Sequence, residues 1–152
     1  MLRRSSVADQ KGHRAATKRS LRSILSGEQF RWALERESQR VDRLNSGDLT
    51  LLLFRVSAGQ RRLSSLRLAR TILSRIRITD DIGWYDREHL GVLLPETSVA
   101  GAWHLSQALC EIVARRGPRP LCTMYNYPAL GEDADAAAVV RAEPADQLKV
   151  AS

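Results

Sequence analysis

The chain has 152 residues, of which 43% are hydrophobic and 27% charged, a balance typical of one soluble globular domain with tails. Its longest apolar runs fall well short of the ~20 residues that span a membrane, and the first residues lack the apolar segment of a secretory signal, so we expect a cytoplasmic protein with no membrane span. Residues 1–24 hold seven basic side chains and one acid, which is most of the net charge of +7. This distribution predicts a disordered basic tail on a nearly neutral domain, and argues against nucleic acid as its partner.

The first helix and strand of the predicted domain, residues 25–130, can be placed from apolar spacing and turn residues. Ser26 is a candidate N-cap, and the turn residues 45–48 end the helix. The continuous apolar segment 49–57 then predicts a buried central strand. The apolar residues that recur at helical spacing, and that we expect to be buried, are Phe30, Leu34, Val41 and Leu44.

A second helix is predicted over residues 59–77, followed by a hairpin with strands near 82–85 and 90–94. Thr97 or Ser98 begins a third helix, and the alternating segment 120–128 predicts a last strand. The buried stripe expected for the second helix is Leu66, Ala69, Ile72, Leu73 and Ile76.

The element order after the first helix is β-α-β-β-α-β. Because βαβ crossovers are right-handed, this order predicts an α+β, ferredoxin-like fold of the nucleotide-cyclase palm type. It has a four-stranded antiparallel sheet with both crossover helices on one face, plus the N-terminal helix. Cys110 and Cys122 lie in apolar patterns and are expected to be reduced core residues. Residues 131–152, Ala-rich and acidic, predict a flexible tail.

The hairpin carries the most specific pattern. Arg77-Ile78-Thr79-Asp80 is followed by five residues, a five-residue turn segment, an apolar strand ending in Leu94-Pro95, and a helix. This register resembles the GGDEF domain, the family of diguanylate cyclases, over about residues 27–137. In that family Arg-x-x-Asp precedes the motif Gly-Gly-Asp/Glu-Glu-Phe. Here the positions of that motif are taken by Asp86, Arg87, Glu88, His89 and Leu90.

The departures from the family indicate a degenerate domain that is not an enzyme. The resemblance implies two Mg²⁺ ions, held by an Asp that ends the first strand and by an acid of the hairpin motif. Glu88 keeps the hairpin acid, but the strand ends in Arg55-Val56-Ser57, and Arg55 repels a cation that requires oxygen ligands. Side chains also replace the paired glycines. We therefore expect no catalytic residue, no metal site and no cofactor.

The Arg-x-x-Asp pair offers a ligand site. In the family it is the product-inhibition site, so the resemblance implies that Arg77 and Asp80 bind cyclic di-GMP. Arg67 and Arg70 are expected on the same helical side, where they would add charge. The alternative is that Arg77 and Asp80 only finish a helix and cap a turn.

The surrounding helix is rich in arginine and has a structural interpretation as well. In the structural interpretation, its basic side chains form a solvated face or pair with acids of the first helix such as Glu35, Glu37 and Asp42. In the functional alternative, they bind an anion or a partner.

The sequence thus favours an inactive GGDEF-like regulatory module, and the most specific form of this hypothesis is a cyclic di-GMP receptor. Its expected partner is another protein or a second copy of the chain. The resemblance also implies a link to exopolysaccharide or cell-envelope control, because such domains occur ahead of bacterial sugar transferases. The alternatives are a nucleic-acid-binding module that uses the basic tail and the Arg-rich helix, and a purely structural dimerisation domain.

Overall fold

The computed structural model describes residues 19–56, 61–128 and 140–141, with no side-chain placement for 61, 62, 140 and 141. All strand pairs are antiparallel, in the order β2-β3-β1-β4-β5, so the first four strands have the predicted ferredoxin-like arrangement. The described residues contain no helix of the length and hydropathy that crossing a membrane requires. The elements are the 3₁₀ helix η1 (Leu21–Ser23), α1 (Gly27–Leu44), β1 (Leu49–Arg55), α2 (Arg61–Leu73), β2 (Asp81–Trp84), β3 (His89–Pro95), α3 (Val99–Ala114), β4 (Cys122–Tyr127) and β5 (Val140–Arg141).

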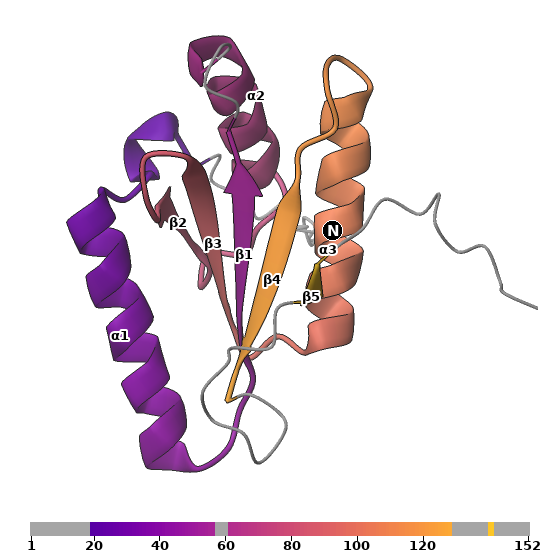
Figure 1. The fold of residues 1–152 in the computed structure, drawn as a ribbon. Helices are drawn as coiled ribbons and strands as arrows, with labels where there is room; N and C mark the ends of the chain where they lie inside the picture. Colours follow the sequence, from indigo (N-terminus) through magenta and orange to yellow (C-terminus); the bar gives the residue numbers. More distant parts are fainter. Residues whose placement is uncertain (1–18, 57–60, 129–139, 142–152) are drawn as a thin grey trace, which may run out of the picture.

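The sheet is covered on both faces. Figure 1 shows α1 on one side of the strands and α2 and α3 on the other. Even-numbered residues of β1, such as Leu52 and Phe54, belong to the core under α2 and α3, whereas Leu51 and Leu53 belong to the core under α1. Side chains on both faces of β1 are therefore buried, which explains why its sequence is continuously apolar rather than alternating.

The helix ends follow the expected capping chemistry. Ser26 forms a capping box with Gln29, and Ser98 is the N-cap of α3, where its Oγ accepts a hydrogen bond from Gly101 N. At the end of α1, Asn45 adopts the left-handed conformation with φ of 45°, which asparagine tolerates better than most residues. These local signals position α1 and α3 at the residues where the sequence predicts them.

One aromatic side chain docks α1 on the sheet. Phe30 is completely buried and lies over Gly83 of β2 and Gly91 of β3, which face each other across the two strands. A Cβ atom on Gly91 would approach the Phe30 ring to 2.6 Å, so only glycine fits there without movement. The two glycines thus form a shallow seat that fixes α1 against the hairpin strands.

Several predicted details of the helices were wrong. In α2, Leu66 is 37% exposed and Leu68 is buried instead, and in α1 Leu44 is 62% exposed. Leucines occur around most of the circumference of α2, so its apolar spacing fits more than one stripe. The helix also ends at Leu73 rather than at residue 77, and it is followed by a turn in which Arg75 N and Ile76 N both donate to Ile72 O.

The ends of the domain also differ from the prediction. Residues 19–24 were assigned to the basic tail, but they contain η1, and the side chains of Leu21 and Ile24 pack on the core. The next residue, Leu25, pairs with β2 in parallel, as Leu25 N donates to Ile82 O. At the other end β5 adds a short fifth strand beside β4. The rest of both predicted tails lies outside the described residues.

Both cysteines are buried and free, as expected, and burial raises the pKa of both thiols. Cys122 faces the core from β4, and Cys110 faces it from α3. They therefore act as small apolar core residues.

Candidate functional site

The hairpin turn between β2 and β3 is held by one carboxylate. Asp86 Oδ1 accepts hydrogen bonds from Glu88 N at 2.7 Å and from His89 N at 2.8 Å, and His89 Nδ1 lies 2.9 Å from both carboxylate oxygens. Burial by itself raises the pKa of Asp86, but the backbone N–H of Glu88 and the His89 ring outweigh it and lower that pKa. The Asp86 carboxylate is thus engaged within the turn.

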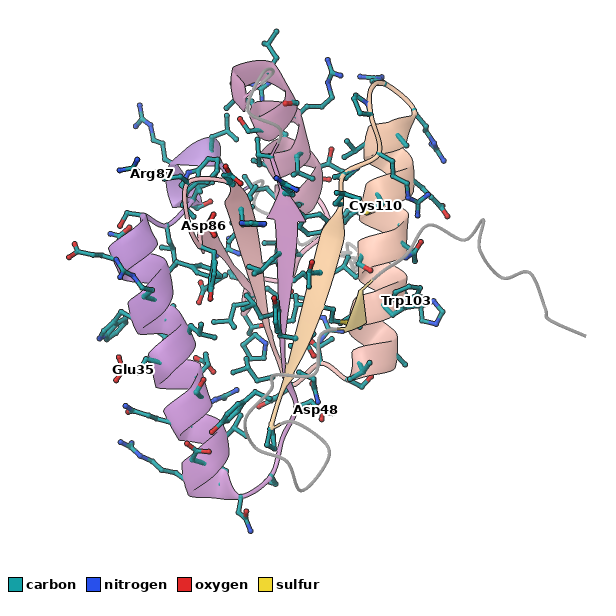
Figure 2. All side chains as sticks on the ribbon, viewed as in Figure 1. Glu35, Asp48, Asp86, Arg87, Trp103 and Cys110 are labelled. Atoms are coloured by element: carbon teal, nitrogen blue, oxygen red, sulfur yellow. The ribbon has the colours of Figure 1, made fainter. Side chains whose placement is uncertain are left out.

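The other motif positions point in different directions. Figure 2 shows Asp86 and Arg87 at the hairpin tip, with Arg87 projecting away from the sheet. Leu90 is fully buried in the core under α2 and α3, so it serves as an apolar anchor for β3. Neither glycine of the family motif is present, and the turn forms by side-chain capping instead.

The end of β1 meets the hairpin acid. Arg55 is paired with His89 in the β1–β3 register, and Val56 N donates to Glu88 O at 2.7 Å. This register places Arg55 Nη2 at 3.8 Å from Glu88 Oε2, with side chains that are 59% and 49% exposed. Ser57, the last residue of the predicted strand, lies outside the described residues.

The Arg-x-x-Asp segment forms a tight turn before β2. Arg77 N donates to Asp80 Oδ2 at 2.7 Å, and Asp80 N donates to Arg77 O at 3.1 Å. Asp80 is only 2% exposed, and its Oδ1 has no hydrogen-bond partner among the described residues. Burial raises the pKa of this carboxyl, against the opposing hydrogen bond from Arg77. The Asp80 side chain therefore caps the turn from inside, while the Arg77 side chain is exposed.

A residue that the sequence assigned to the tail completes this turn. Arg19 Nη1 donates to Asp80 O at 2.5 Å and to Arg77 O at 3.3 Å. Leu21 and Ile24, two apolar residues shortly before the first helix, were the only sign in the sequence that the folded domain begins before residue 25. Two apolar residues without a longer periodic pattern are too few to predict a structural element.

The other two arginines of the predicted site, Arg67 and Arg70, contact different parts of the structure. Arg67 Nη1 donates to Arg116 O at 2.6 Å and ties α2 to the end of α3. Arg70 instead lines an open groove of about 600 Å³ together with Arg19 and Arg22. The structure thus brings Arg70 near the Arg77–Asp80 turn through Arg19, and leaves Arg67 out of the group.

Arg67 and Arg70, the arginines of α2 whose side chains are described, do not pair with α1, contrary to one of the alternatives, because the two helices cover opposite faces of the sheet. Glu37 pairs with Arg36 at 3.1 Å and with Arg40 at 3.0 Å, within its own helix. Asp42 accepts a hydrogen bond from the Tyr127 hydroxyl at 2.6 Å.

Comparison with known proteins gives structural neighbours only. The chain matches no family model and no curated protein. Among solved structures, it resembles a DGC protein from Thermotoga maritima with a TM-score of 0.61 and 16% identity, over 69% of this chain and 82% of that one. It also resembles the GGDEF domain of DgcB from Caulobacter crescentus, solved in complex with c-di-GMP, with a TM-score of 0.54 and 12% identity over 74% of this chain and 77% of that one. The chain therefore has the fold of GGDEF domains.

Proposed function

We propose that this chain is a GGDEF-like regulatory module without cyclase activity. The observation that carries the proposal is the Arg55–Glu88 ion pair at the meeting point of β1 and the hairpin. The resemblance places two acids there to hold Mg²⁺, and phosphoryl transfer depends on that charge neutralisation. A guanidinium beside the remaining acid supplies a positive charge of its own and has no lone pair to give a metal.

The donor set at this position does not fit a divalent cation. Mg²⁺ takes six oxygen ligands, of which one or two are carboxylates and the others are waters and substrate phosphates. Within the described residues no group of three or more His, Cys, Asp or Glu side chains is placed to hold a metal. Asp86, the other acid of the turn, already accepts hydrogen bonds from two backbone N–H groups. Glu88 is left as a single half-exposed carboxylate with an arginine partner.

Incubation of the purified chain with GTP and Mg²⁺ or Mn²⁺, followed by chromatography of the nucleotides, tests this proposal. We expect no cyclic di-GMP, while an active diguanylate cyclase treated alongside forms it. Product that accumulates with the wild-type chain and disappears in Glu88→Gln would overturn the proposal, since it would show that the hairpin acid still works.

A second candidate function, reception of cyclic di-GMP, is favoured by the groove beside the Arg77–Asp80 turn. Its lining includes the three arginines Arg19, Arg22 and Arg70 and the apolar side chains of Leu21 and Leu73. Guanidinium groups bind phosphates and guanine edges, and the two leucines suit contact with the face of a base. The complex of a structural neighbour with c-di-GMP also supports this candidate. In this form of the proposal Arg70 and Arg77 contact the ligand, and buried Asp80 shapes the turn.

Calorimetric titration with cyclic di-GMP tests the receptor function, with two matched variants of the same helix. Arg70→Ala is expected to abolish saturable binding, as is Arg77→Ala. Arg67→Ala is the control, because Arg67 is hydrogen-bonded to Arg116 O, and it should bind like wild type once shown to be folded. Absence of binding by the folded wild-type chain would remove this function and leave the regulatory module without that ligand.

A regulatory module acts through something else, so the proposal includes a protein partner or a second copy of the chain. The resemblance adds exopolysaccharide or cell-envelope control as the process. Measurement of molecular mass at several protein concentrations separates the two kinds of partner. If the partner is a second copy, the fraction of dimer is expected to rise with concentration. If the chain stays monomeric, its partner must be a different protein.

A further inference from the structure

The outer side of α1 carries an exposed tryptophan. The Trp32 side chain is 63% exposed, whereas the other two tryptophans of the chain are partly buried. It lines an open groove of about 450 Å³ between α1 and β2, whose other apolar residues are Leu25 and Ala33. We propose that this surface binds a second copy of the chain, with the two α1 helices antiparallel and their Trp32 side chains in contact at a two-fold axis. The inference rests on the proposed regulatory function, because it names the partner of that module.

The charges on this side of α1 match an antiparallel copy of the same helix. Glu28, Trp32 and Arg36 follow one another at intervals of four residues, so they form one row along the helix. In the commonest packing of two helices, rows of this spacing lie side by side. When the copy runs in the opposite direction about Trp32, Glu28 of one chain lies opposite the partner's Arg36, and this pair occurs twice. Such reciprocal contacts are what a two-fold homodimer requires.

Both charged groups of this row can make the contact. The Glu28 side chain has no ion pair or hydrogen bond within the described part of the chain. Arg36 donates through Nε and Nη2 to Glu37 Oε1, at 3.2 and 3.1 Å, and through Nη2 to Asp81 Oδ2 at 3.5 Å. A guanidinium has five N–H donors, so Nη1 is left for an acceptor on the partner. Because the existing contacts hold Arg36 in place, less conformational entropy is lost when the dimer forms.

The indole of Trp32 supplies the apolar centre of the interface. The Arg36 guanidinium lies 5.1 Å from the centroid of the ring, a cation–π distance that favours one orientation of the indole. Tryptophan is enriched among the residues that dominate binding energy at protein interfaces. Leu25 and Ala33, beside the ring, offer apolar contact to the partner's indole.

The size of the surface indicates a reversible dimer. The 18 residues of α1 span about 27 Å, so one pair of these helices buries less area than the interface of an obligate dimer. We therefore expect monomer and dimer to exchange with protein concentration, which suits a regulatory module.

Analytical ultracentrifugation of the full chain over a series of concentrations tests the proposal. The wild-type chain should show a dimer whose fraction rises with concentration. Trp32→Ala should weaken the association about tenfold or more, because it removes the apolar centre from both chains. Leu63→Ala is the matched control, since Leu63 is 77% exposed on α2, and it should associate like wild type. Circular dichroism confirms that each variant is folded.

Two charge reversals test the antiparallel arrangement. Glu28→Arg and Arg36→Glu should each weaken self-association, because like charges then face each other at both ends of the interface. An equimolar mixture of the two variants should restore the dimer, since every arginine of one chain then faces a glutamate of the other. The arms with Trp32→Ala and Glu28→Arg do not depend on the folding of Arg36→Glu.

Three results would overturn the proposal. The first is a wild-type chain that stays monomeric at all concentrations, which would make the partner a different protein. The second is equal association of Trp32→Ala and Leu63→Ala. The third is a mixture of the folded charge variants that associates no better than either alone. The cyclase assay and the titration with cyclic di-GMP are independent of these results, so failure of the dimer leaves the proposed lack of cyclase activity untouched.

Discussion

Arg55 Nη2 lies 3.8 Å from Glu88 Oε2, and this contact joins the end of the central strand to the hairpin turn. Both side chains are about half exposed, so the pair adds little to stability. Its consequence is electrostatic: the sign of charge at the end of β1 is the reverse of that in a two-acid metal site. The proposed lack of cyclase activity rests on this reversal.

Gly91→Ala should destabilise the protein strongly. The new methyl group would lie 2.6 Å from the Phe30 ring. The backbone of β3 cannot easily move away from the ring, because β3 pairs with strands on both sides. We expect a loss of about 1–3 kcal/mol in the free energy of unfolding, the usual effect of overpacking. Gly101→Ala is the control, because its methyl group meets only ordinary or slightly tight contacts in α3. Urea denaturation should show that control at or above wild-type stability; equal stability of the two variants would contradict the account of the glycine seat.

Asp80 should make stability depend on pH in an unusual direction. Burial raises its pKa above the ordinary value of 3.8, so the folded state binds the proton more tightly than the unfolded state does. Stability therefore falls as pH rises from 3.8 through the folded-state pKa, and recovers as pH falls. Asp80→Asn removes this titration. Unfolding at several pH values should show that the stability of wild type relative to Asp80→Asn decreases from about pH 4 to pH 7; a constant or increasing difference would mean that the carboxyl is not desolvated.

Arg19→Ala should loosen the turn and the segment before α1. The guanidinium binds the carbonyl oxygens of Arg77 and Asp80, so its removal leaves both without that donor. We expect a loss of about 1 kcal/mol and faster hydrogen exchange at Leu25 and Trp84, whose amides bond to Ile82 O and Leu25 O. Arg22→Ala, from the same segment, is the matched control. Equal exchange rates in the two variants would show that Arg19 does not hold this segment.

The sequence predicted the parts of the fold that local chemistry decides. Ser26, Asn45 and Ser98 mark helix ends by their own hydrogen bonds or backbone preference, and they lie at those ends. The order of the four main strands followed from their right-handed connections. By contrast, the seat of Phe30 on two glycines depends on the β2–β3 register and on the helix angle together, which no local pattern reveals.

The same division applies to the candidate site. Loss of the strand acid was visible in the sequence, whereas the contact between Arg55 and Glu88 required the β1–β3 register. The arginines at 67 and 70 have nearly the same helical direction, but they meet different neighbours, the end of α3 and the segment before α1. Helical periodicity gives the direction of a side chain from the helix axis, and the tertiary fold decides what it meets.

The central claim is that Arg55 takes the place of a metal at the hairpin, and a Mn²⁺ titration followed by electron paramagnetic resonance tests it most directly. Wild type and Arg55→Asp are compared at the same protein concentration, with the Arg55→Asp, Glu88→Gln double variant as the control. We predict no saturable binding by wild type, binding by Arg55→Asp where two carboxylates meet, and its loss in the double variant. Saturable binding of Mn²⁺ by wild type, as tight as that by Arg55→Asp and sensitive to Glu88→Gln, would contradict the account.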